Sequence, residues 1–470
     1  MSKERSVMLG EMNVRKLLIK LAIPATIAMM ANALYNLVDT FFIALGAGEI
    51  AIGALGIVYP IQMIVMAIGL MIGMGSASIF SRAYGRGDQD AMTRSVNTAL
   101  LINFIISITI TILGLIYIDR LLIFFGASAG NIGYARDYMF YILIALVPFS
   151  SGIVLNNLAR AEGRPKIAMN SLLIGALLNI LLDPILIFGL WFIPQMGVTG
   201  AAVATLIAKT VAFVYIFRAS TSKESSLNIH LRTIHKFDFH MTKDIVIIGL
   251  PTFVRSTLGA VLVIIINNLI NVYAPADIGP EIYISIYSVI NRMILFLLLP
   301  GLGLVQGLTP IVGFNFGAKF HKRLYDVISY TTRLIVIYFT LMFVVTILSA
   351  ELLFNIFSRE NDPFFIAEGA KALRIISVGF TVLGFQILLS AVYQAMGYPV
   401  RAFLVAISRQ FLLFIPIIYV FTYFMGLPGI WLTFVAADLI AGILSFIVYK
   451  FEMKDLKRKI PLEAFGQSSA

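Results

Sequence analysis

The sequence predicts an all-α integral membrane protein with twelve transmembrane helices in two six-helix lobes. Three observations lead to this prediction: an apolar composition, a dozen long apolar runs, and a repeat that relates the two halves of the chain. Of the 470 residues, 60% are hydrophobic and 13% are charged, whereas a soluble domain carries about 25% charged residues. The composition excludes a water-soluble globule and a disordered chain, and the lack of cysteine excludes a disulfide scaffold.

The apolar runs have the length of helices that cross a bilayer, which need about 20 residues each. They are too long and continuous for membrane β-strands, which have about 10 residues of alternating polarity. The runs fall at residues 17–44, 51–80, 95–117, 134–158, 167–190, 196–217, 245–273, 281–315, 328–349, 368–396, 400–424 and 428–451. Twelve crossings place both termini on the same side of the membrane.

Lysines and arginines are distributed unequally between the two sides. The side of the termini carries 25, and the other side carries four: Arg120, Arg136, Arg359 and Lys371. Because cytoplasmic loops carry the excess of basic residues, both termini are predicted to be cytoplasmic. The net charge of +11 has the same explanation and calls for no nucleic-acid partner. The polar N-terminus lacks the apolar core of a removable signal peptide, so we expect a multi-pass protein of the cell membrane.

A duplication relates the two halves of the chain. Four segment pairs lie at offsets of 227 to 234 residues: LAIPAT (21–26) with IGLPTF (248–253), AYGRGDQD (83–90) with NFGAKFHK (315–322), ARAEGRP (159–165) with YQAMGYP (393–399), and MGVTGAA (196–202) with MGLPGIW (425–431). The repeat predicts an N-terminal lobe at 1–217, a cytoplasmic inter-lobe loop at 218–244, a C-terminal lobe at 245–451 and a cytoplasmic tail at 452–470.

The even number of helices in each half gives both lobes the same orientation, so they are related by a pseudo-two-fold axis along the membrane normal. Two such lobes that rock against each other provide alternating access, which indicates a transporter. A passive channel and a membrane scaffold are the competing interpretations. No GxxxxGK[ST] motif or enzyme motif is found. We therefore expect no enzymatic activity and no cofactor, and energy from an ion gradient, a partner or the substrate's own gradient.

Ionisable residues in the membrane core are costly and are therefore functional candidates. In the first half these are Asp39 and Asp183. Asn179 shares a helix face with Asp183, and Tyr35 shares one with Asp39, because each pair is four residues apart. Thr205 lies within about 5 Å of the aspartates in predicted depth. The sequence therefore predicts a cluster of oxygen donors in the outer half of the first lobe.

This oxygen-donor cluster suits coordination of Na⁺, and it equally suits two carboxyl groups that take up and release a proton. All four histidines fall in predicted cytoplasmic loops, so carboxylates are the only proton carriers expected within the membrane. A structural role, in which the buried aspartates bridge helices, is the competing interpretation.

Several cationic residues in the predicted spans have less certain roles. Lys209 either extends its ammonium group towards the cytoplasm or faces the carboxylates one turn from Thr205. Its counterpart in the repeat is Asp438, which could pair with Arg409 inside the second lobe. Arg255 and Arg292 leave positive charge in that lobe, which could shape the cavity or contact an anionic group.

Several of these segments together resemble a known family. LYNLVDTFF (34–42), ARAEGRP (159–165), NILLDPILIFG (179–189) and GVTGAAVAT (197–205) are similar to segments of the multidrug and toxic compound extrusion (MATE) transporters, in particular the prokaryotic DinF-like branch. The resemblance covers nearly the whole chain.

The resemblance implies an antiporter that expels organic cations or drugs in exchange for H⁺ or Na⁺. It assigns ion coupling to Asp39, Asn179, Asp183 and Thr205, with Tyr35 beside them. The same four residues would be the ligands if the ion is Na⁺. It also implies a bending first helix at Pro24 and a drug-binding surface that includes Asn32 and Asn156. Lys209 departs from the family pattern, in which an uncharged residue is expected.

The resemblance also admits a second function. The wider superfamily contains flippases for lipid-linked oligosaccharides and related polyisoprenoid lipids, whose cavities would carry positive charge for a pyrophosphate group. Arg255, Arg292 and Arg409 keep this alternative open, whereas the carboxylates of the first lobe oppose it. In either case the expected partners are the lipid bilayer and a small amphipathic substrate, with no obligatory protein partner.

Overall fold

The computed structural model describes residues 2–127, 131–190, 193–229, 238–358 and 362–460. The structure therefore describes the predicted inter-lobe loop 218–244 except for residues 230–237. It describes the predicted tail 452–470 up to residue 460. Within the described residues, eleven helices are long and apolar enough to cross a membrane. A twelfth span results if the bent pair α11 (Pro363–Ser377) and α12 (Phe380–Met396), which meet at 50°, is one crossing. The predicted all-helical architecture with twelve spans is confirmed.

The first half of the chain contains seven helices. They are α1 (Ser2–Glu11), α2 (Val14–Arg86), α3 (Gln89–Ile116), α4 (Ile118–Phe124), α5 (Ile132–Ala161), α6 (Pro165–Phe188) and α7 (Gly197–Thr221). The short helices α1 and α4 were not predicted, because neither carries a long apolar run.

The second half begins with α8 (Phe239–Tyr273), α9 (Pro280–Gly317) and α10 (His321–Phe357). After α11 and α12 follow α13 (Pro399–Ile407), the π-helix η1 (Ser408–Phe414), α14 (Ile415–Met425) and α15 (Leu427–Arg458). The predicted run 400–424 is therefore one span, Pro399–Met425, with a π-helical middle.

Helix α2 contains two spans, Val14–Ile43 and Leu55–Arg86. A straight helix of its 73 residues would be about 110 Å long. Gly10, just before α2, and Gly85, at its end, both lie against Phe314. The helix therefore reverses its direction between the two spans, as the predicted runs 17–44 and 51–80 require.

The repeat is visible in the backbone of its turns. Gly163 and Gly397 follow the corresponding helices α5 and α12 with φ of 82° and 78°, and Gly197 and Gly426 stand at the start of α7 and α15 with φ of 55° and 64°. Gly87 has φ of 75°, and its counterpart Lys319 has φ of 60°. This left-handed region is costly for residues other than glycine. The two halves therefore share turn geometry as well as helix order.

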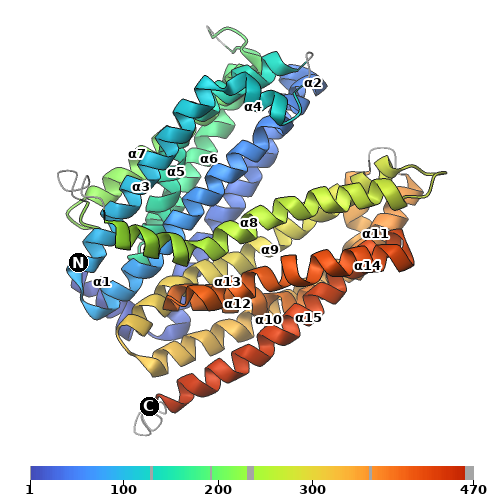
Figure 1. Cartoon of the computed structure of the whole chain (residues 1–470). Coiled ribbons are helices and arrows are strands. Elements are labelled where there is room, and N and C mark those ends of the chain that lie inside the picture. The colour runs from blue at the N-terminus through green and yellow to red at the C-terminus, as the bar shows by residue number, and fades with distance from the viewer. Residues whose placement is uncertain (1, 128–130, 191–192, 230–237, 359–361, 461–470) are drawn as a thin grey trace.

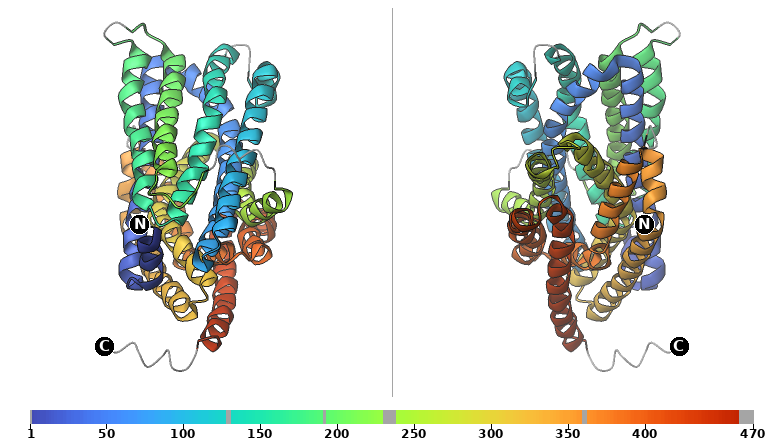
Figure 2. Two further views of the ribbon diagram at one scale, coloured as in Figure 1. Left: turned by 90° about the vertical axis from the view of Figure 1, so that its left-hand side faces the viewer. Right: turned by 90° about the vertical axis from the view of Figure 1, so that its right-hand side faces the viewer.

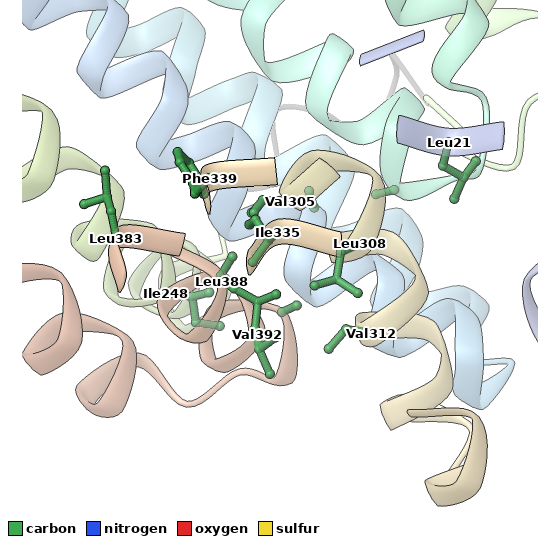
Figure 3. Close-up of a cluster of buried hydrophobic side chains, with 14 of the residues drawn as sticks. Leu21, Ile248, Val305, Leu308, Val312, Ile335, Phe339, Leu383, Leu388 and Val392 are labelled. Carbon is green, nitrogen blue, oxygen red and sulfur yellow. The ribbon is translucent and has the colours of Figure 1, made fainter. Parts of the chain in front are cut away.

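The two bundles meet at the end where the N-terminus and the end of α15 lie, and they spread apart towards the other end (Figures 1 and 2). Where they meet, glycines permit direct backbone contact. A methyl group on Gly75, Gly85 or Gly317 would collide with a carbonyl oxygen of the other bundle: those of Ile245, Phe314 and Arg82, respectively. Figure 3 shows part of the apolar cluster at this contact, which includes Leu21 of the first lobe and Val305, Leu308 and Val312 of the second. We refer to this glycine-lined region as the closed end.

Helix α1 connects the two bundles at the closed end. Arg5 forms an ion pair with Glu162, which is fully buried at the end of α5. From the second bundle, the Arg323 guanidinium donates hydrogen bonds to the carbonyl oxygens of Leu9 (3.2 Å) and Met12 (2.8 Å). The Asn315 amide also donates to the Leu9 carbonyl, at 3.2 Å. These bonds satisfy carbonyl groups that a helix C-terminus leaves without partners.

Gly85→Ala tests whether backbone proximity holds the closed end together. The added methyl group would overlap the Phe314 carbonyl. Overpacking costs about 1–3 kcal/mol, so we expect the closed end to open about tenfold more often. Opening is measured with Ser81→Cys, at a position that is buried in the closed end. Because the chain has no other cysteine, the rate at which maleimide labels this thiol reports how often the closed end opens.

Gly152→Ala is the matched control, because the added methyl group at this buried helical glycine has no neighbour within 4 Å. Its labelling rate should equal that of the cysteine parent. Equal rates for Gly85→Ala and the parent would contradict the proposed role of the glycine contact.

Candidate functional site

The predicted oxygen-donor residues converge in the first lobe from three helices. Tyr35 and Asp39 come from the first span of α2, Asn179 and Asp183 from α6, and Thr205 from α7. All five are buried, Asp183 completely and Asp39 to 7% exposure. Tyr35 and Asp39 are four residues apart, as are Asn179 and Asp183, so the two side chains of each pair lie on one face of their helix. In both helices this face is directed towards the other helices of the site. We refer to these five residues as the carboxyl cluster.

Hydrogen bonds join the members of the carboxyl cluster. The Asn179 amide donates to Asp183 Oδ1 at 3.1 Å and to Thr205 Oγ1 at 3.4 Å. The Asp39 and Asp183 carboxyl groups lie within hydrogen-bonding reach of each other, and the Tyr35 hydroxyl lies within reach of Thr205. Two carboxyl groups can hydrogen-bond only when they share a proton, so this arrangement is compatible with one bound proton.

Three acceptor oxygens of the carboxyl cluster remain without a hydrogen-bond partner although they are buried: Asp39 Oδ1, Asn179 Oδ1 and Asp183 Oδ2. Buried acceptors are normally satisfied. Carboxylate, amide and hydroxyl oxygens are ligands for hard cations, so the set fits Na⁺ as well as a proton. Within the described residues, no three histidine, cysteine, aspartate or glutamate side chains form a metal-binding group. Two carboxylates with neutral oxygens are more typical of a monovalent cation.

Lys209 faces the carboxyl cluster and does not extend away from it. Its ammonium nitrogen lies 4.5 Å from the ring centroid of Tyr35 and 5.2 Å from that of Phe149. These are cation–π distances. Among the ion pairs of the described residues, none joins Lys209 to Asp39 or Asp183. Its charge therefore acts on the carboxylates across the Tyr35 ring, and one ammonium stands beside two carboxyl groups.

The sequence analysis missed two aromatic residues at the carboxyl cluster, both on α5. Phe149 covers the Lys209 ammonium. Tyr138 is 5% exposed, and its hydroxyl is close enough to Asp39 for electrostatic interaction and lies within hydrogen-bonding reach of Gln62. No spacing rule could have found them, because they share no helix with the other members of the cluster.

The other predicted residues of the first lobe lie on α2 and α5. Asn32 is half-buried and lies on the Tyr35 face of α2, three residues earlier. Asn156, on α5, is buried, and its Oδ1 atom has no partner. Pro24 is buried within α2, in the segment that meets the second lobe: Ala22 lies against Gly307, and Thr26 lies against Gly303.

The second lobe has no equivalent of the carboxyl cluster. With the offsets of the repeat, Asp39 corresponds to Ile266 and Thr205 to Phe434. Arg409, in η1, forms the expected ion pair with the buried Asp438. Arg255 is half-buried, and Arg292 is exposed. The duplicated lobes have therefore diverged, and among the described residues the buried acidic oxygens that lack partners all belong to the first lobe.

His240 lies in the first turn of α8, and His321 is the first residue of α10. His230 and His235 fall outside the described residues.

The architecture indicates the class of protein: a membrane transporter with two helical lobes, one of which contains the buried carboxyl cluster. Residues 24–185 and 256–420 match the family model described as MatE. The two matches begin 232 residues apart, as the repeat predicts. The chain belongs to the MatE family of multidrug efflux transporters.

Known proteins are similar to this chain over nearly its whole length. The multidrug export protein MepA of Staphylococcus haemolyticus is 26% identical over 450 residues, which is 96% of each chain. The FAD transporter of Shewanella oneidensis is 25% identical over 92% of this chain and 93% of its own. A solved structure, the outward-facing conformation of a multidrug resistance MATE family transporter of the MOP superfamily, superposes with a TM-score of 0.87. It is 25% identical and covers 96% of this chain and 98% of its own.

Asp183→Asn tests whether the two carboxyl groups repel each other when both are charged. At pH 8 the substitution should raise the melting temperature in detergent by a few degrees, because it removes a buried like-charge contact. At pH 5 a shared proton already relieves this contact, so the change should be small. Scanning fluorimetry at both pH values measures the effect.

Asp438→Asn is the matched control, because the same substitution has the opposite effect there. It leaves Arg409 without its carboxylate, and breaking a buried ion pair costs about 3–5 kcal/mol. The melting temperature should fall at both pH values. A lower melting temperature for Asp183→Asn at pH 8 would contradict charge repulsion in the carboxyl cluster.

Proposed function

We propose that this chain is a cation-coupled antiporter that exports organic cations across the cell membrane by alternating access. The coupling ion is H⁺ or Na⁺, and it binds at the carboxyl cluster. The observation that carries the proposal is the pair of facing carboxyl groups, buried within the first lobe, whose free oxygens have no partner in the protein.

The charge balance of the carboxyl cluster supports coupling to one monovalent cation. Asp39 and Asp183 contribute two negative charges when both are ionised, and Lys209 contributes one positive charge nearby. The remaining negative charge is unfavourable in a low-dielectric environment. One H⁺ or one Na⁺ neutralises it, and so does the charge of an organic cation. The coupling ion and a cationic substrate compete for the one remaining negative charge of the carboxyl cluster, so they are not bound at the same time. This competition is the basis of exchange.

Helix α2 provides a connection from ion binding to the lobe contact. Asp39 lies in the same span as Pro24, and the segment around Pro24 packs against Gly303 and Gly307 of the second lobe. Proline lacks the amide hydrogen that would complete the helix ladder, so the helix bends there at lower cost. Ion binding at Asp39 changes the bend of this span, and the lobes then rock about the closed end.

The orientation follows from the distribution of basic residues. The side of the termini carries 25 lysines and arginines, and the opposite side carries four. Both termini and the closed end are then cytoplasmic. The lobes spread apart towards the outside, so the structure represents an outward-open state. In this state the carboxyl cluster loads its ion from outside, where the concentration is higher.

The substrates are small amphipathic organic cations, and Asn32 and Asn156 contribute to the surface that binds them. The names of relatives support this assignment, since they describe multidrug export and FAD transport. They do not favour the flippase alternative. The proposed transporter needs the bilayer and an ion gradient, and it needs no nucleic acid, protein partner or organic cofactor.

Efflux from proteoliposomes tests the proposal. We expect the full chain to export ethidium when a pH gradient or a Na⁺ gradient is imposed, and the gradient that drives export identifies the ion. Asp39→Asn and Asp183→Asn should each reduce the initial rate at least tenfold, because each removes a charge that the ion neutralises.

Asp119→Asn is the control, because this aspartate pairs with Arg136 at a half-exposed position away from the cluster. Its efflux rate should match that of the unchanged chain. Gradient-driven efflux that survives in both cluster variants would exclude the carboxyl cluster as the coupling site. Conductance without exchange would indicate a channel.

A further inference from the structure

The interior of the second lobe carries positive charge that its own acidic residue does not balance. Of the arginines in its spans, Arg409 is neutralised by Asp438. Arg255 remains within the lobe, in the middle of α8. In the described structure it makes no hydrogen bond, ion pair or cation–π contact, and no charged group stands close enough to affect it. A guanidinium group in this position is costly unless an anion accompanies it.

The surroundings of Arg255 change along α8. One turn closer to the closed end, Thr252 is fully engaged: its hydroxyl hydrogen-bonds to the Gln394 side chain, whose amide also donates to the Ile248 carbonyl at 2.8 Å. Further along α8, three turns beyond Arg255, the buried Oδ1 atom of Asn267 accepts no hydrogen bond. The Asn267 carboxamide can therefore still meet a ligand, whereas Thr252 is engaged within the lobe.

Gln410 lies next to this stretch of α8. Its amide nitrogen would be 3.9 Å from a methyl group placed on Gly259, which is one turn beyond Arg255. Its buried Oε1 atom has no partner. Gln410 belongs to the π-helix η1, next to the Arg409–Asp438 pair. Such π-helical segments occur frequently at functional sites. An unpartnered carboxamide can present either its oxygen or its NH₂ group to a ligand.

The position of Arg255 suits contact with a transported molecule. Gly249 of α8 meets the Met71 backbone of the first lobe and lies six residues earlier than Arg255, about 9 Å along the helix. Beyond that contact the lobes spread apart. Arg255 is also close to the middle of its span, Phe239–Tyr273, and substrate sites of such transporters lie near the membrane midplane. A lipid headgroup at the membrane surface would not reach this depth.

We propose that Arg255, with Gln410 beside it, forms a binding site for an anionic group of the substrate, a carboxylate or a phosphate. The proposal rests on the export function proposed above and deepens it. The planar guanidinium group provides paired donors that match both anions. The first lobe then receives the cationic part of a substrate and the second lobe receives the anionic part. The preferred substrates are amphoteric molecules, in addition to simple cations.

The test compares substrates that differ in their anionic group. Norfloxacin carries a carboxylate and an amine, and its methyl ester lacks the carboxylate. Flavin mononucleotide and riboflavin share a ring system and a ribityl chain, and they differ only in a phosphate group. Binding of these four compounds to the purified full chain in detergent is measured by calorimetry, and export of norfloxacin and ethidium is measured in proteoliposomes.

In Arg255→Gln we expect affinity for the anionic member of at least one pair to fall about tenfold or more, the usual effect of a lost charge-assisted hydrogen bond. The pair affected identifies the anion as carboxylate or phosphate. Affinity for the two compounds that lack the anionic group, norfloxacin methyl ester and riboflavin, should stay unchanged, and so should export of ethidium. Arg333→Gln, at an exposed arginine of α10, should alter none of these. Arg255→Lys keeps the charge but lacks the paired donors. Its affinity for the anionic compound should therefore lie between that of the unchanged chain and that of Arg255→Gln.

Two results would overturn the proposal: unchanged affinity for both anionic compounds in Arg255→Gln, or equal loss for both members of each pair, which would indicate a structural role. If Arg255→Gln does not fold, judged by its melting temperature and size-exclusion profile, the comparison rests on Arg255→Lys. The binding measurement in detergent needs no ion gradient. If the chain exports no compound, the export function is refuted, but the calorimetry still tests the anion site.

Discussion

A hydrocarbon environment does not solvate charge or free backbone polar groups, and most features of this structure follow from that constraint. It requires helices throughout the spans, because only a helix satisfies its backbone internally. It also limits the charges within the spans to a few groups, each with a physical reason. Arg409 and Asp438 neutralise each other. Asp39, Asp183 and Lys209 leave one negative charge, and Arg255 leaves a positive one. The unbalanced groups are those to which we assign ligands.

The two lobes differ in the charges that they carry within their spans. They retain the same helix order and the same left-handed turns, such as those at Gly163 and Gly397. Their interiors have diverged: acidic oxygens occur in the first lobe, and Ile266 and Phe434 stand at corresponding positions in the second. Shared backbone geometry allows the lobes to rock as a symmetric pair, whereas different interiors allow them to bind different chemical groups.

The closed end combines tight packing with a limited extent. Glycines bring backbones of the two lobes into direct contact, and α1 adds hydrogen bonds from Arg323 to its last carbonyl groups. Beyond this region the lobes separate. Because the contact is confined to one end, the lobes can rotate about it without breaking their own cores. The segment around Pro24 lies within this contact, so a change in the bend of α2 acts directly on the lobe arrangement.

Periodicity and composition predicted the spans well, because a membrane helix must be long and apolar wherever it lies in the chain. They missed α1, which is short and polar, and the break between α11 and α12. Helical spacing also paired Tyr35 with Asp39 and Asn179 with Asp183. It could not find Tyr138 or Phe149, which reach the cluster from α5, because contacts between helices depend on how the helices pack.

The sequence by itself therefore determined the twelve-span architecture, the duplication and the identity of the acidic residues. Each of these follows from local composition or from a constant offset along the chain. Only the tertiary structure decided that Lys209 faces the Tyr35 ring, that the carboxyl groups of α2 and α6 meet, and that Arg255 has no counter-charge among the residues that the structure describes. These outcomes depend on distances between helices far apart in sequence, where a difference of a few ångströms separates an ion pair from an isolated charge.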